Sequence, residues 1–134
     1  MWLYNIGIII YTRCIGIASW WYPKAKLWWE GRKGLFERMH QSVKPDDRII
    51  WIHVASLGEF EQGRPIIEKI RERHPEYKIL LTFFSPSGYE IRKNYAGADY
   101  IFYLPADTPA NARKFLDIIH PEIAIFVKYE FWIN

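Results

Sequence analysis

The stretch HVASLGEFEQGRP, residues 53–65, decides the fold that we expect for this chain. It follows the hydrophobic, strand-like run Ile49–Val54 and opens into a helical pattern that continues to Arg73. In α/β proteins, ligands bind in the crevice where parallel strands end and the next helices begin. The sequence therefore places a candidate binding site at this turn.

Glu59 is the reactive candidate in the turn, and two interpretations are open. Ser56-x-x-Glu59 fits a capping box, with Ser56 at the N-cap and Glu59 at the third helical position. A carboxylate at the mouth of the crevice also suits general base catalysis. The spacing alone favours the structural role.

A regular alternation of strands and helices begins at residue 49. Short apolar runs rich in β-forming residues predict four strands, at Ile49–Val54, Lys78–Phe84, Tyr100–Leu104 and Ile123–Lys128. Helical patterns lie between them at about 62–73, 87–95 and 109–119. The pattern predicts an α/β fold, with a Rossmann-like parallel sheet flanked by helices over residues 49–134.

The turns that follow the later strands carry hydroxyls and charges. Ser85 suits a helix N-cap and Pro86 the first helical position, and Ser87 and Gly88 continue the same turn. Thr108-Pro109 repeats this pattern after the third strand, and Lys128 and Glu130 follow the fourth. Because parallel strands end at one edge, we expect these groups to line that edge, where helix N-termini favour anions.

The N-terminal segment differs in kind from the rest of the chain. Residues 1–22, MWLYNIGIIIYTRCIGIASWWY, approach the ~20 apolar residues that cross a bilayer, but Arg13 makes a full span unfavourable. An aromatic belt at Trp20–Tyr22 precedes basic residues, which favours a membrane-associated helix with its C-terminal end at the cytoplasmic face. A buried amphipathic helix is the alternative interpretation.

Residues 23–48 form a basic, aromatic connecting segment. Gly31 and Gly34 flank two basic residues, which suggests a loop near an anionic surface or ligand. The net charge of +3 beside an aromatic segment favours a membrane surface as partner and not nucleic acid. No phosphate-binding loop, dinucleotide fingerprint, zinc-type spacing or serine nucleophile elbow occurs, so we expect neither cofactor nor metal.

Four segments in order resemble one family: HVASLGEFEQGRP, LLTFFSPSGYE, YLPADTPANARKFL and HPEIAIFVKYEFW. They are similar to the N-terminal domain of the 3-deoxy-D-manno-octulosonic acid (Kdo) transferases, and the resemblance covers essentially the whole chain. It implies the first of two Rossmann-like domains in a GT-B glycosyltransferase. This domain would receive the acceptor, and a C-terminal domain absent from this chain would hold most of the CMP-Kdo site.

The resemblance implies an inverting, metal-independent transfer of Kdo from CMP-Kdo to a lipid A precursor. The reaction belongs to lipopolysaccharide biosynthesis, at the cytoplasmic face of the inner membrane. Glu59 would be the general base, and Lys128, which stands where many members have Glu, would contact the transition state or the Kdo carboxylate. The expected acceptor-binding residues are Ser56, Gly58, Ser85, Ser87, Gly88 and Glu130.

Two other functions fit part of the pattern. A membrane-attached, non-catalytic Rossmann-like binding module would also explain the aromatic N-terminus and the basic residues. A GT-B enzyme that uses another nucleotide sugar would share this half of the fold and differ in its donor domain.

Overall fold

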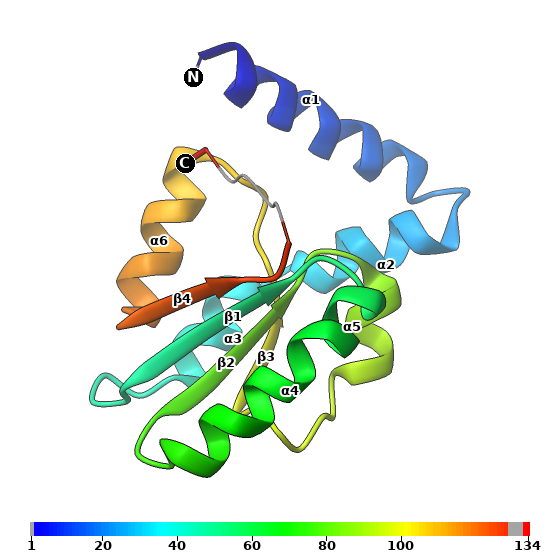
Figure 1. The fold of residues 1–134 in the computed structure, drawn as a ribbon. Helices are drawn as coiled ribbons and strands as arrows, with labels where there is room; N and C mark the ends of the chain where they lie inside the picture. The colour runs from blue at the N-terminus through cyan, green and yellow to red at the C-terminus, as the bar shows by residue number, and fades with distance from the viewer. Residues whose placement is uncertain (1, 129–132) are drawn as a thin grey trace.

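The computed structural model describes residues 2–128, 133 and 134. The elements in chain order are α1 (Trp2–Ala18), α2 (Pro23–Arg32), α3 (Leu35–Ser42), β1 (Ile49–Val54), α4 (Leu57–Arg73), β2 (Lys78–Phe83), α5 (Pro86–Arg92), β3 (Tyr100–Tyr103), α6 (Pro109–Ile119) and β4 (Ile123–Phe126). Figure 1 shows the strands side by side in one sheet, with α1 standing apart from it.

The four strands form one sheet in the order β3-β2-β1-β4, and every pairing is parallel. The central strand β1 pairs on both sides, so that Ile52 lies opposite Leu81 on β2 and Ile125 on β4. The predicted α/β fold with a parallel sheet is confirmed. The first predicted strand, Ile49–Val54, coincides with β1, whereas the other three were predicted to end one or two residues too late, because the chain leaves the ladder before its apolar run is complete.

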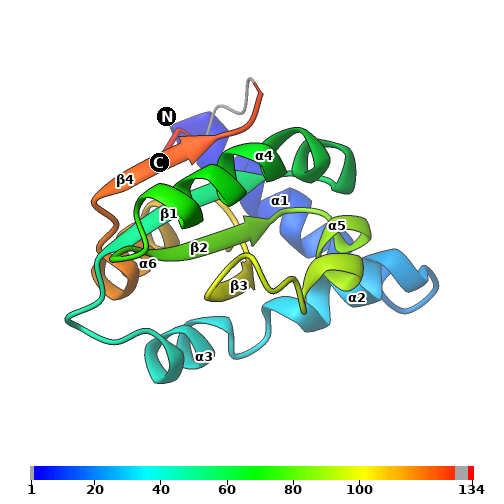
Figure 2. The ribbon, with the colours of Figure 1, turned by 60° about the horizontal axis from the view of Figure 1, so that its bottom comes forward.

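Helices cover the sheet on both faces (Figure 2). On one face, Ile49 and Trp51 pack in a cluster with side chains of α3 and α6. On the other, Ile50, Ile52 and Val54 pack in a cluster with α4. Since successive side chains of a strand point to opposite faces, this alternation buries all six residues of β1. The central strand is therefore enclosed on both faces, and its carboxyl end leads into the turn that carries Glu59.

One polar cluster lies inside this core. The Trp51 indole nitrogen Nε1 donates to the Thr82 hydroxyl at 2.8 Å, and His53 Nδ1 lies 2.9 Å from the same oxygen. The ring of His53 also contacts that of Phe126 edge to face. Burial lowers the pKa of His53 to about 4, so the imidazole is neutral at pH 7.

Helix α2 packs closely on the end of β3. A Cβ atom at Gly31 would lie 2.2 Å from Cε2 of Tyr103, which is buried and stacks on Tyr89 with 4.0 Å between ring centroids. Only glycine fits this contact. A second glycine, Gly34, has a φ of 62° and separates α2 from α3.

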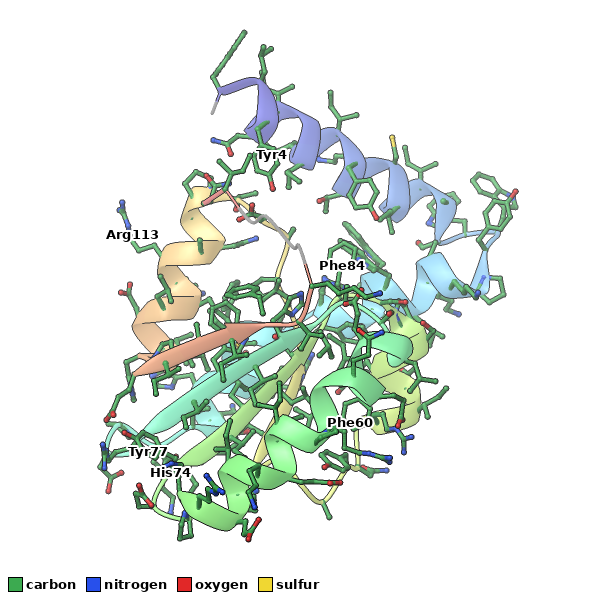
Figure 3. The ribbon with its side chains drawn as sticks, viewed as in Figure 1. Tyr4, Phe60, His74, Tyr77, Phe84 and Arg113 are labelled. Atoms are coloured by element: carbon green, nitrogen blue, oxygen red, sulfur yellow. The ribbon has the colours of Figure 1, made fainter. Side chains whose placement is uncertain are left out.

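Helix α1 is attached to the body mainly through polar contacts and α2. None of its residues is buried. The Tyr4 hydroxyl points toward the body and donates to Asp107 in the loop after β3 (Figure 3). Burial and this bond raise the pKa of Tyr4 to about 12. Among the residues that the structure describes, no helix has the length and apolar character needed to cross a membrane.

We predict that Gly31→Ala destabilises the fold, because the buried Tyr103 ring cannot move away without losing its packing. The expected loss is about 1–3 kcal/mol, the usual cost of overpacking, measured by urea unfolding. Gly7→Ala is the matched control, since no atom lies within 4 Å of the added Cβ there. Equal effects of the two substitutions would contradict the close contact.

We predict that His53 makes the fold sensitive to acid. The pKa is about 4 in the folded state and ordinarily near 6.5 in an unfolded chain. The unfolded state therefore binds a proton first as the pH falls. The free energy of unfolding should drop by about 3 kcal/mol between pH 6.5 and 4 from this residue alone. Urea unfolding across that range should show a shallower pH dependence in His53→Gln, and equal slopes would refute the assignment.

Candidate functional site

The carboxyl ends of the strands provide the candidate site. The chain leaves β1 toward β2 on one side, whereas β4 pairs with β1 on the other. The strand order therefore reverses between β1 and β4, and α/β sheets bind ligands at such a switch point. The turns after these two strands carry Glu59 and Lys128.

Glu59 lies in the first turn of α4 and is half-buried. Its Oε2 accepts a hydrogen bond of 2.6 Å from the backbone N–H of Ala55. Within the part of the chain that the structure describes, Oε1 makes no hydrogen bond. One oxygen is therefore fixed by the backbone and the other is available to a ligand.

The predicted capping box is wrong in detail. Ser56 is the N-cap residue, but its side chain makes no capping hydrogen bond. The carboxylate of Glu59 reaches back past Ser56 to the N–H of Ala55. The physical reason is that β1 ends at Val54, so the Ala55 N–H has left the ladder and needs another acceptor.

The turn after β2 is joined to the turn after β1. The backbone N–H of Ser85 donates to the carbonyl of Ala55 at 2.8 Å. Ser85 is the N-cap of α5, and its Oγ accepts from the N–H of Ser87 at 3.3 Å and lies 2.8 Å from the Ser87 hydroxyl. This confirms the predicted cap, and it places both hydroxyls beside the turn that holds Glu59.

The two glycines of the predicted site have different surroundings. Gly58 is exposed, and no atom lies within 4 Å of a Cβ built there. Gly88 is buried, and its Cβ would lie 2.5 Å from the Phe83 ring and 3.1 Å from the backbone nitrogen of Leu57. Gly88 therefore lets α5 approach the start of α4. A contact of either residue with an acceptor stays a prediction.

Lys128 lies at the same edge, directly after the last residue joined to β1. The N–H of Val127 donates to the carbonyl of His53 at 3.1 Å. Lys128 is exposed and has a φ of 70°, a left-handed conformation that is uncommon outside glycine. No ion pair joins Lys128 to Glu59 among the described residues. Glu130 lies outside the residues that the structure describes.

Arg32 is the residue that sequence reasoning misplaced. Arg32 and Lys33, the two basic residues between Gly31 and Gly34, were expected to face an anionic surface or ligand. Arg32 instead points inward from the last turn of α2. Its Nε donates to the carbonyl of Leu104 at 2.8 Å and its Nη2 to that of Phe84 at 2.9 Å. Burial lowers its pKa to about 9, which leaves the guanidinium charged at pH 7. The spacing of Trp28 and Arg32 on one helix face is the one sequence signal for this arrangement.

A cavity of about 130 Å³ lies on the α6 face of the same edge. It is lined by Trp51, Leu104, Pro105, Ala106, Asp107, Ala112, Phe115, Leu116, Phe126 and Asn134. Glu59 is not among these residues, because α4 lies against the opposite face of the sheet. The candidate base therefore does not line this largely apolar cavity.

Comparison with known proteins identifies the family. Residues 29–134 match the sequence model of the family described as 3-deoxy-D-manno-octulosonic-acid transferase (kdotransferase). This match includes all four strands and the helices α3–α6.

Several curated relatives carry the same name, 3-deoxy-D-manno-octulosonic acid transferase. The protein from Aquifex aeolicus is 36% identical over 69% of this chain and 26% of its own length. Those from Haemophilus influenzae and Chlamydia muridarum are each 30% identical, over 67% and 69% of this chain and 21% and 22% of their own lengths. The chain thus spans about a fifth to a quarter of these relatives. It belongs to the Kdo transferase family of glycosyltransferases.

Proposed function

We propose that this chain is the acceptor-side domain of a transferase that moves Kdo from CMP-Kdo to a lipid A precursor in lipopolysaccharide biosynthesis. The observation that carries the proposal is the position of Glu59 in a member of this family. Its carboxylate lies at the strand-order switch point, with Oε2 held by Ala55 N–H. In a GT-B enzyme this sheet is the first of two Rossmann-like domains, and the second binds most of the donor.

The proposed reaction is a single inverting displacement. The acceptor hydroxyl oxygen attacks the anomeric carbon of Kdo, and the bond between that carbon and the CMP phosphate oxygen breaks. The free oxygen of Glu59 takes the hydroxyl proton as the new glycosidic bond forms. CMP leaves with the electron pair as a phosphate anion, a leaving group that needs no metal in this proposal.

The remaining site residues surround this step in the proposal. The hydroxyls of Ser56, Ser85 and Ser87, with Gly58, Gly88 and Glu130, line the acceptor side. Lys128 contacts the Kdo carboxylate, a role that suits a cation at the end of β4. The left-handed backbone conformation of Lys128 supports a functional role for this residue, because strained backbone conformations are frequent at functional sites.

The proposed location is the cytoplasmic face of the inner membrane. Helix α1 and the following turn expose apolar and aromatic side chains, among them Trp20 at 82% and Trp21 at 70% exposure. Such residues suit the interface between lipid and water. Because Tyr4 joins α1 to the loop after β3, the helix lies on the carboxyl side of the sheet. A lipid acceptor in the membrane would then reach the edge that holds Glu59.

We predict that Glu59→Gln in the full-length protein lowers kcat for Kdo transfer by about 10²–10⁴-fold, the usual contribution of a general base. The Gln side-chain carbonyl can still accept from Ala55 N–H, so the fold should persist by circular dichroism. Glu61→Gln is the matched control, since Glu61 pairs with Arg92 between α4 and α5. Transfer by Glu59→Gln at a near wild-type rate would refute the base.

We predict that deletion of residues 1–22 abolishes binding to vesicles of anionic phospholipid, measured by co-sedimentation of the full-length protein. Trp20→Ser with Trp21→Ser should weaken binding, because the interfacial aromatic rings are lost. Ile66→Ser is the control, as Ile66 is exposed at 46% but lies on α4. Recovery of the intact protein in the soluble fraction without detergent would contradict the proposal.

A further inference from the structure

A series of hydrogen bonds links α2 to Ala55, the residue that also holds the candidate base. Arg32 Nη2 donates to the carbonyl of Phe84 at 2.9 Å. The N–H of Ser85 donates to the carbonyl of Ala55 at 2.8 Å. The N–H of Ala55 donates to Oε2 of Glu59 at 2.6 Å. These contacts join residues that lie far apart in the sequence.

The middle of this series is a single peptide unit. The carbonyl of Phe84 and the N–H of Ser85 belong to the same planar amide. A charged donor on the carbonyl polarises that amide and strengthens the hydrogen bond that its N–H donates. The hydrogen bond from Arg32 therefore strengthens the one that Ser85 donates to the Ala55 carbonyl, one residue beyond the end of β1.

Arg32 itself is fixed from several sides. Its guanidinium carbon lies 3.8 Å from the centroid of the Trp28 ring and 4.8 Å from that of Tyr103. Nε donates to the carbonyl of Leu104, at the end of β3, while Nη2 donates to Phe84, at the end of β2 and beside α2 (Figure 3). One planar group thus joins the ends of two strands.

Lysine cannot reproduce this arrangement. An ammonium group is a single compact charge, whereas the guanidinium fork presents several N–H donors in one plane and stacks on aromatic rings. Within the described part of the chain, the hydrogen bonds of the Arg32 guanidinium go to backbone carbonyls, and the third of them joins Nη1 to the carbonyl of Trp28 at 3.2 Å. The hydrogen-bond partners of Arg32 among the described residues are therefore parts of the fold.

We propose that Arg32 is a positioning residue that holds the turn between β1 and α4, and through it the carboxylate of Glu59. The catalytic consequence rests on the proposed function of Glu59, whereas the effect on the turn does not. Arg32 fixes the Phe84–Ser85 peptide, that peptide fixes Ala55, and Ala55 orients Glu59.

The effect on the turn is tested by amide hydrogen exchange, measured by NMR on the 134-residue chain. In Arg32→Lys, the amides of Ala55 and Ser85 should exchange at least about tenfold faster, while those of Ile52 and Leu81 in the sheet stay protected. Arg48→Lys is the matched control, since Arg48 pairs with Glu122 near the amino ends of the strands. Unchanged protection at Ala55 and Ser85, or equal loss throughout the sheet, overturns the proposal.

A measurement on the unsubstituted chain covers the case in which Arg32→Lys does not fold. A scalar coupling through the hydrogen bond should be detected between the Ser85 nitrogen and the Ala55 carbonyl carbon. A second is expected between an Arg32 side-chain nitrogen and the Phe84 carbonyl carbon. Absence of both couplings overturns the proposal.

The effect on catalysis is tested in the full-length protein. Arg32→Lys should lower kcat by about 10- to 100-fold, because small displacements of a reacting group are costly, with KM for CMP-Kdo unchanged. The same substitution should cause no further loss in a Glu59→Gln background, since residues that act as one unit are not additive. Additive losses overturn the positioning role. If Glu59→Gln alone is near wild type, the proposed base has failed, and the exchange at Ala55 and Ser85 still decides whether Arg32 holds the turn.

Discussion

The complete burial of β1 is the constraint on which the rest of the structure depends. It lies between two parallel neighbours with helices on both faces, and all six of its residues are buried. Its backbone groups are satisfied by the ladder up to Val54 and lose their partners one residue later. The N–H of Ala55 instead donates to the Glu59 carboxylate, and the carbonyl of Ala55 accepts from the N–H of Ser85. The candidate site arises where the ladder ends.

The structural and catalytic interpretations of Glu59 are therefore not alternatives. A carboxylate that satisfies a backbone donor is held in one place, as a general base requires. Because Oε2 accepts the hydrogen bond from Ala55 N–H, Oε1 is the oxygen that would accept the hydroxyl proton in the proposed reaction. The same reasoning separates Glu59 from Glu61, which is two residues away and pairs with Arg92 instead.

The N-terminal helices complete the edge that binds the acceptor in the proposed function. Arg32 of α2 joins the ends of β2 and β3, and Tyr4 of α1 reaches Asp107 after β3. Three side chains of residues 35–43 are also buried in the core, from Leu35, Met39 and Val43. The helices that carry the proposed membrane surface are thus joined by hydrogen bonds to the segments that follow β2 and β3.

Sequence periodicity determined the parallel α/β fold, and local turn chemistry determined the starts of α5 and α6, because both depend on residues within about four positions of each other. The strand-end position of Glu59 followed from the same local pattern, and its proposed chemistry came from the resemblance. Only the tertiary structure decided that Ser56 does not cap α4, that Gly88 is buried and that Arg32 turns inward. The partners of Arg32 at Phe84 and Leu104 lie 52 and 72 residues away in the chain. No local pattern encodes such distant carbonyls, since they come together only when the sheet has formed.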